Sequence, residues 1–330
     1  MANRNLNVGV MYSENTFSSP INNGVSSGWP SKYSARMFVE FINSGLNLYN
    51  LKWSDISKNL DIVKTTNLES GEVLRNIPLD FLDVLCFFGF GDIGELQGND
   101  EEITGLVDIL DKNPVIPTIN PTSVVLSARK NKKKYLLNLN EIGIPAPETR
   151  LAFSLESAEE IGCEFIGKYG GFVVKPVNGY GGYLIDKFPG GDSNVLDKIL
   201  SEQGEILVQQ YVDDIHEFGE RSVYIVDGKI EYTVLKKTSD GILTNVTRNR
   251  SHVNRFLVEC TPEERELAFL ARETLAPDAL IARADLIGRQ DNPLIGELTL
   301  SSIGLHNSLF ENMENLPAKA YLKLIDKLTS

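Results

Sequence analysis

A strand followed by a glycine-rich loop occupies residues 170–182, and no other stretch constrains the fold of this chain as strongly. The apolar run at 172–174 is aromatic and β-branched, which predicts a buried strand. Lys175 stands at its end, and Pro176 stops the ladder because it has no backbone N–H group. The glycines that follow suit a loop whose backbone N–H groups close over phosphates. A phosphate site is one interpretation of these residues, and a hairpin turn with a surface lysine is the other.

Length and charge narrow the class of protein. At 330 residues the chain exceeds what one core usually supports, so two or three subdomains are expected. A net charge of −13 argues against a nucleic-acid partner, because neutralising phosphates requires a basic surface. No apolar run is long enough to span a membrane and the first residues lack a signal peptide's apolar core, so we expect no membrane partner and a cytoplasmic protein. The cysteines are too scattered to predict disulfides or zinc.

Strand and helix patterns alternate in the first third of the chain, which predicts a mostly parallel sheet. Strands are expected at residues 6–11, 46–53, 82–88 and 115–119, and helices at 35–42 and 100–111. Residues 89–94 read Gly-x-Gly-x-x-Gly, which raises a dinucleotide site as an alternative. That fingerprint belongs on the first strand–helix turn, with an acidic residue at the end of the next strand, and neither condition is met. A loop that faces a ligand between domains fits better.

The remaining two thirds mix helices with strands that are not separated by helices. Helices are expected at residues 135–141, 154–161, 263–275 and 318–328, and strands at 205–211, 222–226, 229–235, 279–287 and 294–300. The Asp-Gly pair at 227–228 predicts a hairpin, and the last helix is expected to be exposed. We therefore predict an α/β chain that is α+β in its C-terminal half, with domains at 1–125, 126–207 and 208–330.

Two carboxylates lie in otherwise apolar predicted strands, Asp285 in one and Glu297 in the next. A buried ionised carboxylate is costly unless it is paired or binds a metal. On adjacent antiparallel strands the two could hold Mg²⁺, which prefers oxygen ligands. Pairing with an arginine such as Arg283 or Arg272 is the alternative. Combined with Lys175 and the glycine-rich loop, a metal and nucleotide site accounts for more of the chain.

Six segments in this order resemble the ATP-grasp superfamily, and especially its bacterial glutathione synthetase-like ligases, including the cycloserine synthetase type. They lie at 132–145, 173–182 (Val-Val-Lys-Pro with Gly-Tyr-Gly-Gly), 207–222 (Leu-Val-Gln-Gln-Tyr-Val with Gly-Glu-Arg-Ser), 234–237 (Val-Leu-Lys-Lys), 283–286 (Arg-Ala-Asp-Leu) and 297–300 (Glu-Leu-Thr-Leu). Residues 91–98 also resemble the substrate-side loop of D-alanine–D-alanine ligases. The likeness implies an ATP-grasp fold, in which an N-terminal parallel α/β domain precedes two subdomains that clasp ATP.

The resemblance implies a role for each matching residue. Lys175 and one lysine of the cluster, most simply Lys133, would contact the ATP phosphates, with Lys130, Lys132 and Lys134 left open by an uncertain register. The phosphate loop would comprise Gly179, Tyr180, Gly181 and Gly182. The adenine and ribose would meet Gln209, Gln210, Tyr211, Val212 and Glu220, with Lys236 added to the nucleotide contacts. Arg250, or Arg248 if the loop is shifted, would join Lys175 in balancing charge on the transferred phosphoryl group.

One position departs from the family pattern. Glutathione synthetases carry Glu-x-Asn and the cycloserine synthetase type carries Glu-x-Glu, whereas this chain has Glu297-Leu298-Thr299. The implied metal ligands are Asp285, Glu297 and Thr299, and a neutral hydroxyl is a weak ligand for a second Mg²⁺. One or two ions therefore stay open, with Mn²⁺ as an alternative metal, and so does the extent of turnover.

The implied activity is an ATP- and Mg²⁺-dependent carboxylate–amine ligase that forms an amide through an acyl phosphate, on a small amino acid-like substrate. Two alternatives stay open: a nucleotide-binding homologue with little turnover, and a ligase that acts on a peptide or carrier protein. The partners would be a small carboxylate and a small amine, and a homodimer is left open. The sequence names neither substrate. His216, His252 and His306 are interpreted as structural or surface residues.

Overall fold

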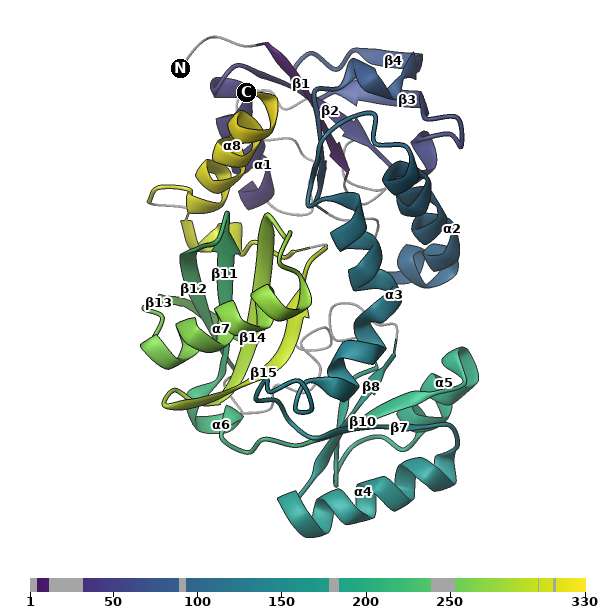
Figure 1. The fold of residues 1–330 in the computed structure, drawn as a ribbon, viewed down its shortest axis with the longest axis vertical. Coiled ribbons are helices and arrows are strands. Elements are labelled where there is room, and N and C mark those ends of the chain that lie inside the picture. Colours follow the sequence, from purple (N-terminus) through teal and green to yellow (C-terminus); the bar gives the residue numbers. More distant parts are fainter. Residues whose placement is uncertain are drawn as a thin grey trace.

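Three β-sheets follow one another along the long axis of the protein in the computed structural model (Figure 1). The structure describes residues 5–11, 32–88, 93–177, 184–238, 253–301, 303–310 and 313–330, and at 32–35, 93–100, 131–134 and 307–308 it describes only the course of the helices. In those parts of the chain no helix is both long and apolar enough to cross a membrane. The mixed α/β class predicted from the sequence is confirmed.

The N-terminal sheet is mostly parallel, as predicted, and has the order β4-β3-β2-β1-β5-β6. Its strands are β1 (Leu6–Met11), β2 (Leu46–Leu51), β3 (Asp61–Asn67), β4 (Val73–Pro78), β5 (Val84–Phe87) and β6 (Thr118–Ile119). The antiparallel pair β3 and β4 was not predicted, because β4 has no buried residue and the buried positions of β3 do not follow an apolar alternation. The helices here are α1 (Lys32–Asn43), α2 (Ile93–Lys112) and α3 (Thr122–Asn138), with short 3₁₀ turns at Trp53–Asp55 and Leu79–Phe81. The helix predicted at 135–141 is the last turn of the longer α3.

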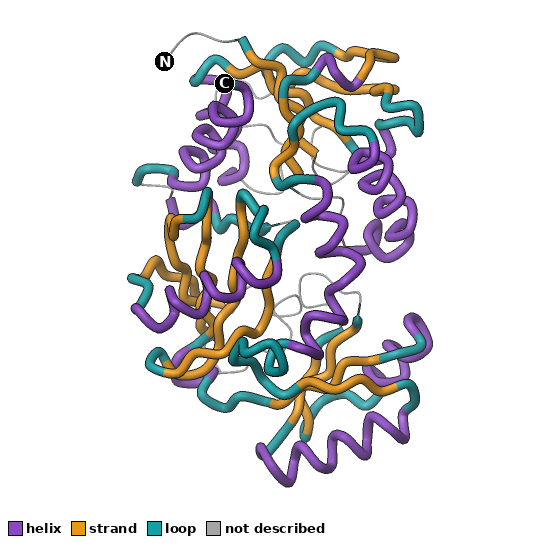
Figure 2. The backbone as a smooth tube through the Cα atoms, in the orientation of Figure 1, coloured by secondary structure: helices purple, strands orange, loops and turns teal. Residues whose placement is uncertain are grey.

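The second sheet in chain order, which we call the lid sheet, is antiparallel with the order β7-β10-β8-β9. Its strands are β7 (Thr149–Ala152), β8 (Phe172–Pro176), β9 (Asp186–Phe188) and β10 (Ile206–Gln210). The helices α4 (Leu155–Tyr169) and α5 (Asn194–Gln203) cover one face, and Figure 2 shows α4 on the side away from the rest of the molecule. Ser154 starts α4 by accepting a hydrogen bond from the Ser157 amide, and Gly170 ends it with a left-handed φ of 77°.

The C-terminal sheet, which we call the base sheet, is antiparallel with the order β13-β12-β11-β14-β15. Its strands are β11 (Glu220–Val226), β12 (Lys229–Thr238), β13 (Val253–Val258), β14 (Ile281–Arg289) and β15 (Asn292–Thr299). Asp227 and Gly228 both have positive φ, so the predicted hairpin between β11 and β12 is confirmed. The helix α7 (Pro262–Leu275) covers one face, and the short α6 (Ile215–Phe218) precedes β11.

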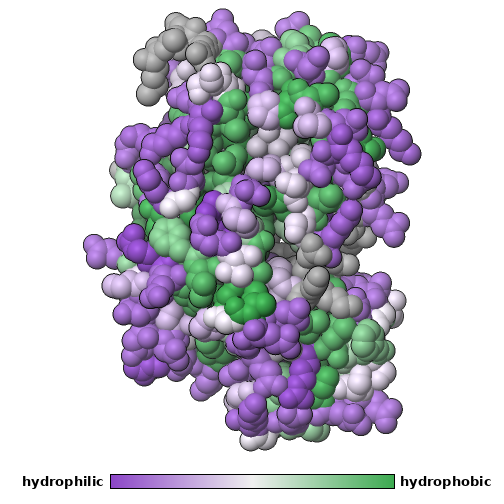
Figure 3. Space-filling model, in the orientation of Figure 1, coloured by the Kyte–Doolittle hydropathy of each residue, from purple (hydrophilic) through white to green (hydrophobic). Residues whose placement is uncertain are grey.

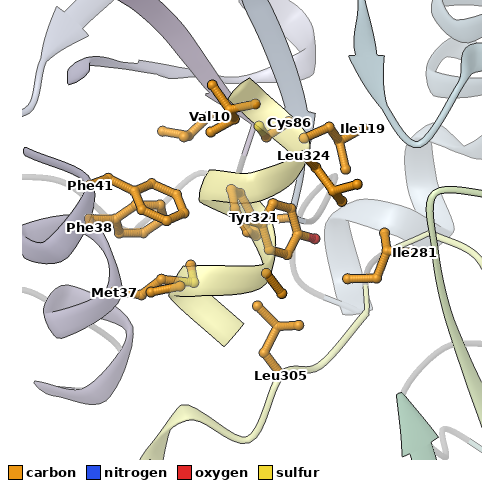
Figure 4. Packing of buried hydrophobic residues seen from close by; sticks show 14 of the residues in the cluster. Val10, Met37, Phe38, Phe41, Cys86, Ile119, Ile281, Leu305, Tyr321 and Leu324 are labelled. Carbon is orange, nitrogen blue, oxygen red and sulfur yellow. The ribbon is translucent and has the colours of Figure 1, made fainter. Parts of the chain in front are cut away.

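The base sheet and the N-terminal domain share one hydrophobic core (Figure 4). The last helix, α8 (Leu316–Thr329), lies beside α1 and places Tyr321 at the centre of this core, with its ring 4.5 Å from that of Phe88. The predicted exposure of the last helix was therefore wrong, because its apolar face is buried between two domains. A 3₁₀ turn at Asn307–Phe310 adds Phe310 to the same core. In the face drawn in Figure 3, hydrophilic side chains dominate the periphery, in keeping with the charge of the chain.

Candidate functional site

Alternation along β11 divides its side chains between the two faces of the base sheet. Arg221 lies beneath α7, where it pairs with the buried Glu264, and Val223 and Ile225 pack on the same face. Glu220 and Ser222 therefore point to the opposite face. A set of charged and polar side chains consequently gathers on the face that α7 leaves uncovered.

The strand register brings predicted site residues together on that face. Glu220 lies directly opposite Lys236, and Asp285 lies between Ser222 on one side and Glu297 on the other. The register shifts immediately after Asp285, and such an irregularity re-aims the neighbouring side chains. Residues from four predicted segments are thus neighbours in the fold. We call Glu220, Ser222, Lys236, Arg283 and Asp285 the charged cluster.

Asp285 is the centre of the charged cluster and is only 5% exposed. The guanidinium of Arg283 donates to it from Nη2 at 2.7 Å and from Nε at 3.0 Å, and the Ser222 hydroxyl donates to Oδ1. Burial would raise the pKa of this carboxyl, but Arg283 and Lys236 outweigh burial and hold the pKa below its usual range. Asp285 therefore stays ionised although it is buried.

Lys236 links the two acidic members of the charged cluster. Its ammonium group pairs with Glu220 and lies 3.3 Å from Oδ1 of Asp285. Burial would lower the pKa of the amine, but the two carboxylates outweigh burial and raise the pKa above its usual value. Lys236 is thus a fixed, desolvated cation, which is the kind of group that binds phosphate oxygens strongly.

The predicted metal ligands fit a magnesium ion that shares its shell with a nucleotide. Glu297 is half-buried across from Asp285, and the Thr299 hydroxyl accepts a hydrogen bond from Arg283 Nη2 at 3.2 Å. Within the described ranges, no three Asp, Glu, His or Cys residues come together to form a complete protein cage. Mg²⁺ is typically held by one or two carboxylates plus waters and substrate phosphates. The pair Asp285 and Glu297 meets that requirement, and Thr299 as a ligand stays a prediction.

The lid sheet presents Lys175 on its face away from α4 and α5. In β8, Phe172 and Val174 are buried in the lid core, so the alternating residues Val173 and Lys175 point the other way. Lys175 is half-buried next to Pro176, the last residue of the strand, as the sequence predicted.

For several residues predicted to contact ATP, the structure describes only the backbone or does not describe the residue. Lys133 lies in α3, together with Lys132 and Lys134, where side chains are not described, and Lys130 forms an exposed pair with Asp108 at 3.4 Å. The remaining predictions lie outside the described residues: Gly179, Tyr180, Gly181, Gly182, Arg248, Arg250 and the start of the loop 91–98.

The predicted adenine-binding segment leaves the lid sheet toward the base sheet. Gln209 is buried and donates to the Thr149 hydroxyl at 2.8 Å, while Gln210 accepts from the Glu148 amide at 3.2 Å. Both side chains therefore serve the lid in this structure. The Tyr211 ring lies 3.7 Å from the Lys187 ammonium, and half-buried Val212 follows it. Contacts of these residues with a nucleotide stay predictions.

Sequence reasoning treated Arg283 only as a rival partner for Asp285 and did not single out Ser222 for a role. In the structure Arg283 does pair with Asp285. It also belongs to the candidate site, where it donates to the Thr299 hydroxyl. Arg272, the other arginine considered, instead pairs with Glu273 and with backbone carbonyl groups. Arg283 stands two residues before Asp285 in one strand, so period-two alternation could have placed both on one face.

Comparisons with known proteins identify a family and relatives that this chain resembles. A family model described as "Prokaryotic glutathione synthetase, ATP-grasp domain" matches residues 140–290. A curated relative from Methanosarcina acetivorans, named tetrahydromethanopterin:alpha-L-glutamate ligase, is 28% identical over 243 residues, which are 67% of this chain and 67% of the relative.

Solved structures share the fold over the full length. The D-cycloserine synthetase DcsG aligns with a TM-score of 0.67 at 18% identity, covering 97% of this chain and 99% of its own. The ATP-grasp ligase PsnB, solved with a minimal precursor variant, Mg and ADP, aligns with a TM-score of 0.61 at 13% identity, covering 99% of each chain. The family model, the curated relative and these structures all indicate an ATP-grasp ligase.

Proposed function

We propose that this chain uses ATP and Mg²⁺ to join the carboxylate of one amino acid-like substrate to the amine of another, through an acyl phosphate. The observation that carries the proposal is the charged cluster, in which the buried Lys236 and the half-buried Arg283 are held as cations around the ionised Asp285. Such an arrangement matches a reaction in which negative charge moves between phosphate oxygens.

The reaction has two steps, a phosphoryl transfer and an acyl transfer. In each step, negative charge shifts between oxygen atoms that would lie next to the charged cluster. A carboxylate oxygen first attacks the γ-phosphorus of ATP, and the bond to ADP breaks. The amine nitrogen then attacks the acyl carbon, phosphate leaves with the electron pair, and the nitrogen loses a proton. Asp285 and Glu297 would hold Mg²⁺, which would supply positive charge to offset that of the phosphate oxygens.

The cluster is already ordered by its own contacts. Ser222 and Arg283 fix the carboxylate of Asp285, and Glu220 holds the ammonium of Lys236 on the other side. Cations that are fixed before the substrate arrives need little reorganisation during the reaction. We assign Lys236 and Arg283 to stabilising the transferred phosphoryl group and the tetrahedral centre that follows.

The other predicted residues complete this assignment. Lys175 and Lys133 would hold phosphates from the lid side, with Gly179 to Gly182 closing over them. Arg250, or Arg248, would add charge balance, and residues 209–212 with Glu220 would hold the adenosine. The hydroxyl of Thr299 is already used by Arg283, which favours one tightly bound ion over two.

The test is acceptor-dependent release of ADP by the purified chain. ATP and Mg²⁺ are supplied with pairs drawn from amino acids and hydroxy acids, starting with L-glutamate as the amine because the curated relative is named for it. We expect ADP release that requires both substrates and an amide product whose mass equals their sum less water. A peptide substrate that replaces the small acid would indicate the peptide-acting alternative. ATP binding without substrate-dependent ADP release across the panel would contradict the proposal.

A further inference from the structure

The segment after β15 folds back over the face of the base sheet opposite α7 and leads to His306. Two tyrosines of that face hold it, since the Tyr224 hydroxyl donates to the Gly304 carbonyl and the Tyr232 hydroxyl donates to the Leu305 carbonyl at 3.1 Å. Leu305 is buried in the core shared with the N-terminal domain. His306 has a left-handed φ of 51°, which a residue with a Cβ adopts at a cost. Its position is therefore fixed by several independent contacts.

This segment lies against the charged cluster. A Cβ atom built on Gly304 would be 3.4 Å from Nη1 of Arg283, so the backbone passes directly beside that guanidinium. The ring of His306 meets the ring of Tyr224 edge-on, with 6.2 Å between centroids. The imidazole thus lies beside the end of the sheet where Arg283 and Asp285 are held together.

The imidazole of His306 has an unused nitrogen. Nε2 is withdrawn from solvent and has no hydrogen-bond partner among the described residues. Burial, and after it the cations Lys236, Arg283 and Arg255, lower the pKa of the ring to about 2, against an opposite effect of Asp285. The ring is therefore neutral at pH 7 and keeps a lone pair available. A buried polar atom without a partner is uncommon and calls for an explanation.

We propose that His306 receives the proton that the amine nucleophile loses when the amide bond forms. This inference rests on the proposed ligase function, since that reaction releases a proton from nitrogen next to the charged cluster. The amine nitrogen bonds to the acyl carbon, phosphate departs with the electron pair of the broken carbon–oxygen bond, and one N–H proton passes to Nε2 of His306. No further reactant is needed.

Bound nucleotide would make the imidazole a better base. The groups that face it are Tyr224 from β11, Lys236 from β12, Arg255 from β13, and Arg283 and Asp285 from β14. The three cations depress its basicity when no phosphate is present. Phosphate groups beside Lys236 and Arg283 would offset that charge and bring the pKa of His306 back toward its ordinary value. The proton acceptor would thus become effective only once phosphate groups are bound beside Lys236 and Arg283.

The test compares two nucleophiles in His306→Asn, because asparagine tolerates the left-handed backbone at this position. Both nucleophiles lose an N–H proton when the new bond forms, but the adduct of an ordinary amine holds that proton more tightly, because its nitrogen is more basic, and so depends more on a positioned base. We expect amino acid-dependent ADP release to fall by about 10²-fold, within the usual range for a general base. Hydroxylamine-dependent ADP release should fall by less than about tenfold. Tyr232→Phe, which loosens the same segment but keeps the imidazole, should lower both reactions equally.

Other outcomes distinguish a failure of the proposal for His306 from a failure of the proposed ligase function. Equal losses with both nucleophiles in His306→Asn would overturn the proposal and leave His306 as a structural residue. Unchanged amino acid ligation would overturn it too. If His306→Asn does not fold, His306→Gln and the pH profile of the wild type take its place. With rates expressed per unprotonated nucleophile, the amino acid reaction should then decline with acidity between about pH 8 and 5, and the hydroxylamine reaction should not; parallel profiles would overturn it. A wild type without ADP release would instead refute the ligase function.

Discussion

The base sheet and the lid sheet are both antiparallel, but they are held in the molecule differently. The base sheet shares a core with the N-terminal domain, in which Tyr224 and Ile281 lie with Val10 and Phe41. The lid sheet has a core of its own, around Phe165, whose buried members all lie between residues 152 and 208. It reaches the core beneath α7 mainly through Leu207 and Val177.

This difference assigns different tasks to the two sheets. The charged cluster lies on the sheet that is continuous with the rest of the protein, so its geometry is set by the global fold. Lys175 lies on a separately packed unit that few buried side chains join to the base. Units with few shared contacts open at lower free-energy cost than the global fold. We infer that the base keeps the reacting groups in place and that the lid brings Lys175 to them.

The largest expected effect comes from one substitution in each sheet. Asp285→Ala should abolish turnover and destabilise the fold by about 3–5 kcal/mol, because it leaves Lys236 and Arg283 buried without their shared partner. Lys175→Ala should also abolish turnover but leave stability nearly unchanged, because the side chain is only half-buried at a strand end. Urea unfolding together with ADP release measures both. Equal destabilisation by the two substitutions would contradict the distinction between base and lid.

Core truncations test the same comparison at the level of packing. Phe165→Ala removes a fully buried lid side chain, which should cost about 3–5 kcal/mol locally. Amide exchange should then speed up at residues 149–210 and stay unchanged in β1 and β11. Tyr321→Ala should speed up exchange in the N-terminal domain and the base sheet together. Faster exchange throughout the chain in Phe165→Ala would show that the lid is not a separate unit.

A smaller effect concerns two asparagines that bridge backbone segments. The buried Asn120 donates to the Ile281 and Leu300 carbonyls at 2.6 and 2.8 Å and accepts from the Ile281 amide at 2.7 Å, which ties the first domain to the base. Asn120→Ala should cost about 1–3 kcal/mol, because it leaves buried backbone groups unpaired. Asn140 makes two similar bonds to Ala146 in the exposed segment before the lid. Its replacement by alanine should lower the free energy of unfolding, measured by denaturant titration, by clearly less. An equal loss would count against the claim that the base sheet is held more firmly than the lid.

Much of the fold could be predicted because its strands alternate or are wholly apolar. β1, β5, β10 and the β11–β12 hairpin were predicted close to their observed bounds. The strands β7, β9 and β13 were not predicted, since each is short or half-exposed and is defined by its partner more than by its own residues. The burial of α8 depends on a contact with the first domain that no local pattern encodes.

The candidate site was predictable where a charged side chain stands within an apolar stretch of sequence. Asp285 stood out as a carboxylate within an apolar strand, and the register then brought Glu220 and Lys236 to it. His306 gave no such signal, because its environment comes from tyrosines and cations on four other strands. The predicted division at 125 and 207, and the contacts of the glycine-rich loop, stay predictions.

Adjacent lysines allow the most direct test of the claim that the charged cluster is the reaction centre. Lys236 is buried against Glu220 and Asp285, whereas Lys237 points to the other side and donates to the Glu217 carbonyl at 2.7 Å. The measurement is acceptor-dependent ADP release by Lys236→Met and Lys237→Met at saturating ATP and Mg²⁺. We expect Lys236→Met to lose at least about 10²-fold in turnover, as when a charge-stabilising group is removed, and Lys237→Met to match the wild type. Equal turnover in the two variants would contradict the account.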